Sequence, residues 1–379
     1  MNDSRSPVIP PLGPQNHPLY REISRHETRG SLTVQVRIRE ASRQLNTAYS
    51  QTVPKQMKKF VVRRTIQLAI TYFVFLTLLF VIFRLAPGDP TSMYIIDGMS
   101  PEERQQVLER HGLHEPLHVQ YVQFITDFLT LEFGNSYRYG SPVADLVWLR
   151  FWNTIFLMAT AFGFAYAIGI IFGAFLGWVR GSRKEKVGLV FALIARSSPE
   201  FWIGIVLVMV FSFWLGLFPA GNMRTPGTTI ETFWGRYLAW DFAYHLVLPA
   251  ITGIIFYMAT PTLLMRNSMI SVLNEDFIEV KKAEGIPEYM ILYKHAARNS
   301  ILPVSTVVAI IIGMTLGGSL LIETVFNWPG MGREMVDSVV YNDYPVAQAV
   351  FFLMGSVVIF MNFVADLGYT YLDPRVRYD

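Results

Sequence analysis

Six long apolar stretches constrain this chain more than any other feature of its sequence. A helix needs about 20 apolar residues to cross the hydrocarbon core of a bilayer, and only helices and closed barrels satisfy their backbone hydrogen bonds there. The stretches lack the polar alternation of barrel strands, so they predict membrane-spanning helices. They cover residues 66–86, 154–179, 201–218, 246–265, 301–322 and 346–369.

A shorter apolar segment, 187–195, leads into the third stretch, and Pro199 lies between the two. Proline has no backbone N–H and its ring clashes with the preceding turn of a helix. The sequence therefore predicts a kink or a new helix start at this point.

Composition agrees with a membrane protein. Hydrophobic residues make up 52% of the 379 residues and charged residues only 16%, against roughly 25% charged in ordinary soluble proteins. The net charge of +3 is small, and no basic patch with interleaved aromatic residues indicates a nucleic acid partner. The chain has no cysteine, which excludes disulfides, thiolate metal sites and a cysteine nucleophile.

Basic residues predict the orientation, because cytoplasmic loops carry an excess of lysine and arginine. Such residues precede the first span, fill the loops after the second and fourth spans and recur at the C-terminus, whereas the loops 219–244 and 323–345 hold few. Six spans with both termini in the cytoplasm satisfy these loops and place the 87–150 loop outside. The basic residues are Lys58, Lys59, Arg63 and Arg64, then Arg180, Arg183, Lys184 and Lys186, then Arg266, Lys281, Lys282, Lys294 and Arg298, and finally Arg375 and Arg377.

Two segments lie outside the spans. Residues 1–57 are polar, and no apolar core follows Met1 closely enough to make a cleavable signal peptide, so we expect a loosely ordered cytoplasmic extension before a transmembrane domain at 58–379. In the external loop, Ser100 and Pro101 favour a short helix over 101–111. Residues 119–133 are apolar at helical spacing and predict a helix that lies on the outer membrane surface or against the bundle.

Motifs for catalysis are missing from the sequence. No G-x-x-x-x-G-K-[ST] loop occurs, so we expect that the chain does not bind and hydrolyse ATP by itself. No H-E-x-x-H or G-x-S-x-G motif indicates an enzyme. The second, fourth and fifth spans contain no acidic residue, which argues against a proton-coupled carrier.

Three external histidines, His111, His114 and His118, form an H-x2-H-x3-H pattern. Imidazoles could ligate zinc or nickel, but Gly112 and Pro116 interrupt any single helical face. We therefore favour surface histidines in a loop over a metal site.

The strongest local feature is the segment 276–303. It predicts two short amphipathic helices with a break between them, because Gly285 suits a helix C-cap with positive φ and Pro287 suits the start of the next helix. The apolar residues leave a surface on a loop that faces water, and such a surface indicates a docking site. A helical hairpin packed on the protein's own spans fits the pattern equally well. The apolar residues are Phe277, Ile278, Val280 and Ile286.

This segment resembles the cytoplasmic loop with which permeases of ATP-binding-cassette (ABC) importers engage their ATPase subunits. Glu284 and the pair Lys281 and Lys282 depart from the small-basic-small pattern of that family. The matching residues are Ala283, Gly285, His295, Ala296, Arg298, Asn299, Leu302 and Pro303.

Further marks, in the family's order along 58–379, resemble the B-type permease of the dipeptide/oligopeptide/nickel importer family, whereas residues 1–57 have no counterpart in it. The marks are Pro87-Gly88-Asp89-Pro90, Glu115-Pro116-Leu117, Gln120-Tyr121, Ser198-Pro199, Phe201-Trp202, Leu248-Pro249, Glu323-Thr324-Val325-Phe326, Pro329-Gly330-Met331-Gly332-Arg333, Asp343-Tyr344-Pro345 and Leu372-Asp373-Pro374-Arg375-Val376-Arg377.

The resemblance implies an all-α permease of six spans in the cell membrane, surrounded by lipid. It implies a second homologous permease, two cytoplasmic ATPase subunits that bind the ATP and magnesium, and an external binding protein, with no cofactor in this chain. The implied substrates are di- or oligopeptides, with nickel or an oligosaccharide as alternatives. From other classes, an ATP-independent secondary carrier and a membrane-embedded enzyme remain as alternatives. The implied coupling residues are Phe277, Ile278, Lys282, Ala283, Glu284, Gly285, Ile286, Pro287, His295 and Arg298.

Overall fold

The computed structural model describes residues 60–84, 115–228, 232–301 and 320–372, together with residues 100, 102 and 304. Within these residues every regular element is helical, and one isolated bridge joins Asn135 to Pro142. Residues Thr65–Val376 form one compact unit, and nearly all of the described residues belong to it.

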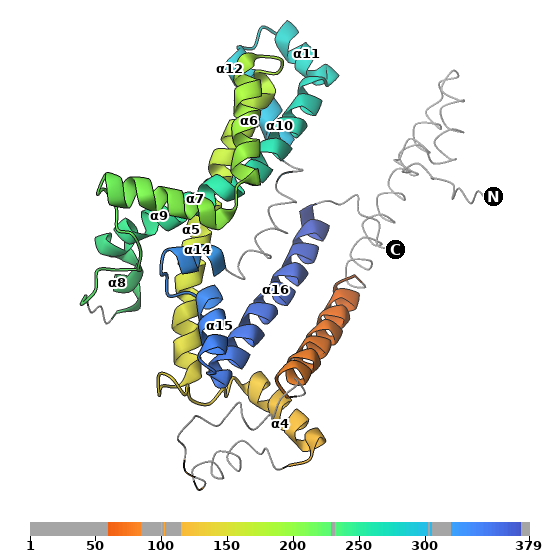
Figure 1. Ribbon diagram of the computed structural model, residues 1–379. Helices are drawn as coiled ribbons and strands as arrows, with labels where there is room; N and C mark the ends of the chain where they lie inside the picture. Colours follow the sequence, from red (N-terminus) through yellow and green to blue (C-terminus); the bar gives the residue numbers. More distant parts are fainter. Residues whose placement is uncertain are drawn as a thin grey trace, which may run out of the picture. The chain divides into compact units, whose positions relative to one another are not determined.

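Four of the described helices are long and apolar enough to cross a membrane (Figure 1). The predicted all-α membrane fold is confirmed, and the four helices cover the stretches predicted as the first, second, fourth and sixth spans. The fifth predicted span, 301–322, lies mostly outside the described residues. The four helices are Phe60–Arg84, Val143–Trp178 (α5), Trp240–Leu273 (α9, Trp240–Tyr257, and α10, Ala259–Leu273) and Tyr344–Leu367, which belongs to α16 (Tyr344–Leu372).

The third span differs from the prediction. Helix α6 (Arg183–Ser197) meets α7 (Glu200–Leu207) at a bend of 102°, and α7 continues as the π-helix η2 (Val208–Trp214). The bend lies at the predicted break, where Pro199 has extended backbone (ψ 137°). The 8 residues of α7 and the 7 of η2 rise only about 22 Å, less than the roughly 30 Å of a hydrocarbon core. This segment alone is therefore too short to cross the membrane, and with α6 it forms either one broken span or a re-entrant loop.

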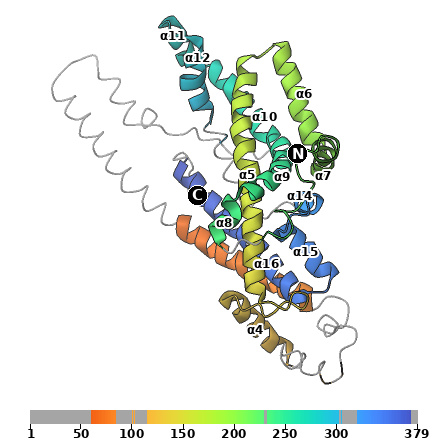
Figure 2. The same ribbon diagram turned by 90° about the vertical axis from the view of Figure 1, so that its left-hand side faces the viewer.

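Helix α5 contacts α10 through a row of glycines (Figure 2 shows α5 lengthwise). A Cβ atom at Gly169, Gly173 or Gly177 would lie 2.6 Å from Pro261 Cγ, 2.3 Å from the Thr262 carbonyl oxygen or 2.7 Å from Met269 Cβ, respectively. Only glycine permits such a close approach of two helices in a membrane. The row therefore fixes α5 and α10 against each other along most of their shared length.

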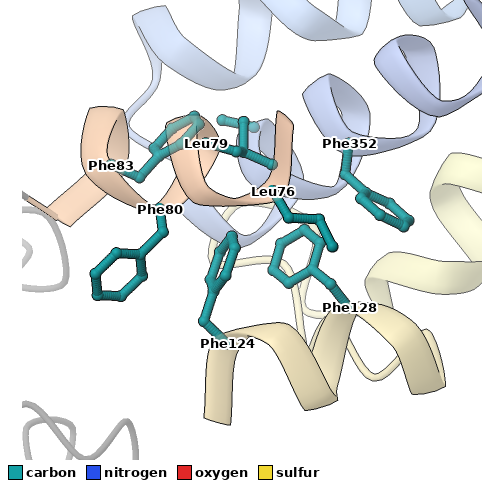
Figure 3. Packing of buried hydrophobic residues seen from close by; sticks show 8 residues of the cluster. Leu76, Leu79, Phe80, Phe83, Phe124, Phe128 and Phe352 are labelled. Carbon is teal, nitrogen blue, oxygen red and sulfur yellow. The ribbon is translucent and has the colours of Figure 1, made fainter. Parts of the chain in front are cut away.

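Helix α4 (Leu117–Thr130) packs against the first-span helix and α16 (Figure 3). The Phe124 ring lies 5.5 Å from Phe80, and the Phe128 ring lies 5.0 Å from Phe352. Offset and edge-on aromatic pairs at this distance stabilise a core beyond the area that they bury. Of the two predicted positions for this helix, the one against the bundle is confirmed. The helix predicted over 101–111 lies outside the described residues, apart from residue 102.

Candidate functional sites at the two ends of the bundle

The 276–300 loop has the two short helices that the sequence predicts. Helix α11 (Asp276–Ala283) ends at Gly285, whose φ of 74° is left-handed, and the amide of Gly285 donates to the carbonyl oxygen of Lys282 at 3.0 Å. Pro287 then caps α12 (Glu288–Met290), which continues into the π-helix η3 (Ile291–Ala296). The glycine allows the chain to reverse and the proline starts the second helix, as predicted.

The loop is seated on the end of α10. Ile278 is fully buried in a cluster with Met269 and Val272 of α10 and with Ile291 and Leu292 of η3. The prediction that Ile278 belongs to an exposed apolar surface is therefore wrong. The reason is that α11 folds back on α10, so the central apolar residue of α11 faces the protein. Ile278 fixes the position of the loop rather than presenting a contact.

The rest of the loop divides into exposed and half-buried residues. The sequence analysis missed two exposed aromatic residues, Tyr289 and Tyr293, which lie four residues apart on one helical face. Their i, i+4 spacing was the signal that could have identified them. Val280 of α11 is exposed as well. The predicted coupling residues that are exposed are Lys282, Ala283, Glu284, Gly285, Pro287 and Arg298. Those that are half-buried are Phe277, Ile286 and His295.

This division predicts effects of very different size on stability for two neighbouring substitutions. Ile278→Ala is expected to cost about 2–5 kcal/mol, because it leaves a cavity between α11 and α10, whereas Val280→Ala is expected to cost less than about 0.5 kcal/mol because the side chain is exposed. Thermal unfolding of the purified variants in detergent measures the difference. A melting temperature lowered equally by both substitutions would contradict the packing of Ile278.

At the opposite end of α5, a buried carboxylate joins two segments that are far apart in sequence. Glu323 of α14 (Leu320–Val325) is fully buried and accepts hydrogen bonds from the Thr154 hydroxyl at 2.6 Å and from the amide of Arg333 at 2.8 Å. The Thr154 hydroxyl oxygen accepts from the amide of Met331 at 2.7 Å. Both amides lie in the first turn of α15 (Met331–Val340), where a negative charge is favourable.

The residue before Thr154 holds the same turn. Asn153 donates from Nδ2 to the carbonyl oxygen of Pro329 at 2.7 Å, and its Oδ1 accepts from the Tyr237 hydroxyl at 2.8 Å. The indole of the fully buried Trp328 donates to the Asn153 carbonyl oxygen at 3.0 Å. We call Asn153, Thr154, Glu323 and Trp328 the Glu323 cluster. It fixes the 323–333 segment to α5.

The glycines beside the cluster are required by its geometry. A Cβ atom at Gly330 would lie 2.3 Å from the carboxyl carbon of Glu323, and one at Gly332 would lie 3.1 Å from its Oε2. The sequence analysis noted this Pro-Gly-Met-Gly-Arg segment and Glu323 only as family marks. It did not pair Glu323 with Thr154, because a contact across 169 positions leaves no local pattern.

A second buried carboxylate fastens the turn before α5. Asp343 accepts hydrogen bonds from the Ser136 hydroxyl and from the amides of Tyr137 and Arg138, the amides at 3.1 and 3.2 Å. The Arg138 guanidinium lies 3.8 Å from the centre of the Tyr341 ring. This arrangement joins the 131–142 turn to the start of α16. The end of the bundle that carries the Glu323 cluster is therefore held together by buried hydrogen bonds between segments far apart in the sequence.

Of the three histidines, His118 is exposed at the start of α4, and His111 and His114 lie outside the described residues. Among the residues that the structure describes, no group of three or more histidine, aspartate or glutamate side chains could hold a metal ion.

Comparisons with known proteins cover most of the chain. The family described as "Binding-protein-dependent transport system inner membrane component" matches residues 169–378, and the N-terminal part of that family matches residues 57–158. The oligopeptide transport system permease protein AppB of Bacillus subtilis is 37% identical over 325 residues, which are 85% of this chain and 100% of that protein. The dipeptide transport system permease protein DppB of Alkalihalophilus pseudofirmus is 34% identical over 310 residues, 79% of this chain and 93% of that protein.

Proposed function

The chain belongs to the family of binding-protein-dependent transport system inner membrane components, and we propose that it is a permease subunit of an ABC importer of di- or oligopeptides. Peptides are favoured over nickel or an oligosaccharide because the relatives are named as oligopeptide and dipeptide permeases. The observation that carries the coupling to ATPase subunits is the 276–300 loop, which presents an exposed face in a chain without a P-loop.

The proposed assembly contains this chain, a second homologous permease, two ATPase subunits and a substrate-binding protein. ATP and magnesium are bound by the ATPase subunits, and this chain supplies no catalytic group. The loop lies on the cytoplasmic side, as the basic residues of the flanking loops indicate. The Glu323 cluster then lies at the outer side, where the binding protein delivers the peptide.

The proposed mechanism transmits motion along α10 and α5. Met269 is shared by two contacts, because it packs under the loop beside Ile278 and also faces Gly177 of α5. A displacement of the loop by the ATPase subunits therefore moves α10 and α5 together. The far end of α5 carries Thr154 and so moves the Glu323 cluster. Alternating access requires that the two states of the permease differ in how the loop fits the ATPase subunits.

The docking role predicts that a bulky residue on the exposed face blocks transport without unfolding the chain. Ala283→Trp is expected to lower peptide uptake and recovery of the ATPase subunits by at least about tenfold, because an indole on this face prevents close contact. Co-purification from the membrane and uptake of a labelled peptide measure both effects. Lys184→Trp is the matched control, because Lys184 is an exposed residue of another predicted cytoplasmic loop. Normal ATPase recovery and uptake with Ala283→Trp would contradict the docking role.

The assembly itself is tested by mild detergent extraction of the tagged chain from its native membrane, followed by mass spectrometry of the proteins recovered. Recovery of a second permease and of P-loop ATPases is expected. Recovery of the chain alone would contradict the ABC assignment and favour a carrier that works without ATP.

A further inference from the structure

The segment between η2 and α9 exposes large apolar side chains to an unusual degree. Trp214 at the end of η2 is 71% exposed and Trp240 at the start of α9 is 83% exposed. Between them, α8 (Phe233–Leu238) exposes Trp234 and Leu238. Large apolar side chains that are exposed in one short segment indicate contact with lipid or with a partner.

Two arginines lie in the same segment. The guanidinium of Arg224 donates to the carbonyl oxygen of Arg236 at 2.7 Å, which places it beside α8. Within the described residues neither arginine forms an ion pair. Asp241 acts on Arg224 by its charge, but it already accepts from the amide and hydroxyl of Thr225 at 2.9 and 2.7 Å. The segment thus offers two positive charges to an anion.

The distance of Trp240 from the fourth predicted span gives the depth of this segment in the membrane. Trp240 begins a helical stretch that runs to Leu273, and the apolar stretch 246–265 within it is the predicted span. Trp240 precedes that span by six residues, or about 9 Å along a helix. This distance places Trp240 in the headgroup layer, where tryptophan is enriched because its ring is apolar and its N–H is polar. The 276–300 loop lies at the other end of the stretch.

We propose that this segment binds an anionic phospholipid in the leaflet opposite the 276–300 loop. The headgroup phosphate binds to Arg224 and Arg236, since guanidinium groups match phosphate oxygens in geometry and charge. The acyl chains lie against Trp234, Leu238 and Trp240. A lipid satisfies both features of this segment, its two arginines and its exposed apolar side chains. This inference depends on membrane insertion alone and not on coupling to an ATPase.

Native mass spectrometry of the complete chain, purified in detergent and titrated with phosphatidylglycerol, tests the proposal. Arg224→Gln combined with Arg236→Gln is expected to weaken retention of one phosphatidylglycerol molecule by about tenfold. Arg183→Gln combined with Lys184→Gln removes the same charge at the start of α6 and is expected to leave that retention unchanged. Arg224→Lys combined with Arg236→Lys keeps the charge but loses the planar fork of donors, and it is expected to retain more phosphatidylglycerol than the glutamine variant and less than the wild type, which separates lost binding from misfolding.

A second measurement locates the acyl chains. In nanodiscs, phosphatidylglycerol with brominated acyl chains quenches nearby tryptophan fluorescence, and the quenched fraction is expected to fall in Trp234→Phe combined with Trp240→Phe. Unchanged phosphatidylglycerol retention in the Arg224→Gln, Arg236→Gln variant would overturn the proposal. So would loss of the second permease from that variant with retention unchanged, because the surface would then be a protein interface. Loss of ATPase recovery alone would bear on the proposed function and not on the lipid site.

Discussion

Glu323→Ala is expected to abolish peptide uptake and to lower the melting temperature of the purified chain by several degrees. The substitution leaves the Thr154 hydroxyl and the Arg333 amide, both bonded to Glu323, without an acceptor in a buried site. Each buried donor left unpaired costs about 1–3 kcal/mol, so the pair costs about 2–6 kcal/mol. Thermal unfolding in detergent and uptake in reconstituted vesicles measure the two effects.

Asp337→Ala supplies the control on the same helix, α15. Asp337 pairs with Arg333 at 3.5 Å and with Arg138 at 4.0 Å, and its side chain is 28% exposed. Such a pair contributes less than about 1 kcal/mol, so this variant is expected to melt and to transport almost as the wild type does. An equal loss of stability in the two variants would show that burial of the Glu323 carboxylate does not determine its contribution to stability.

Gly173→Leu is expected to have the largest effect of any single substitution in α5. The first side-chain carbon would lie 2.3 Å from the Thr262 carbonyl oxygen and 2.9 Å from Met265 Cβ, and a backbone oxygen cannot move aside as a side chain can. The two helices must separate, at a cost above about 3 kcal/mol. We expect loss of folded protein after detergent extraction and loss of uptake, measured by size-exclusion chromatography and by uptake of labelled peptide.

The same helix provides a matched control. Gly163 is exposed, and a Cβ atom there would meet nothing within 4 Å. Gly163→Leu is therefore expected to express, to elute and to transport as the wild type does, since leucine favours a helix more than glycine. A Gly173→Leu chain that elutes and transports normally would show that α5 and α10 are not held together by the glycine row, and the proposed route of motion would fail with it.

Local patterns in the sequence predicted the features that depend on local physics. The apolar stretches coincide with four long apolar helices, Pro199 located the bend, and the positive φ of Gly285 followed from its place between two short helices. The resemblance to importer permeases identified the family. Each of these depends on a few neighbouring residues, so one sequence is sufficient to see it.

The features that were missed depend on which face of a helix is buried. Ile278 and Val280 are both apolar residues of α11, but only the fold-back of α11 on α10 makes one a core residue and leaves the other exposed. The row of Gly169, Gly173 and Gly177 lies within a long apolar run and looks there like ordinary span composition. The third span was expected at 201–218 because the hydropathy of that stretch is high. Hydropathy does not reveal a bend, such as the one of 102° between α6 and α7.

The short third span has a consequence for the order in which the chain enters the membrane during its synthesis. Helix α7 and η2 are too short to be held by lipid alone, and the packing partners of α7 are made later. A Cβ atom at Gly204 would lie 3.2 Å from Phe326 and 3.5 Å from Thr252. A ribosome that has completed α7 has therefore not yet produced the surfaces that bury it. We expect this segment to settle only after α9 and α14 have emerged, so that an early helix reaches its final position after helices that follow it in the sequence.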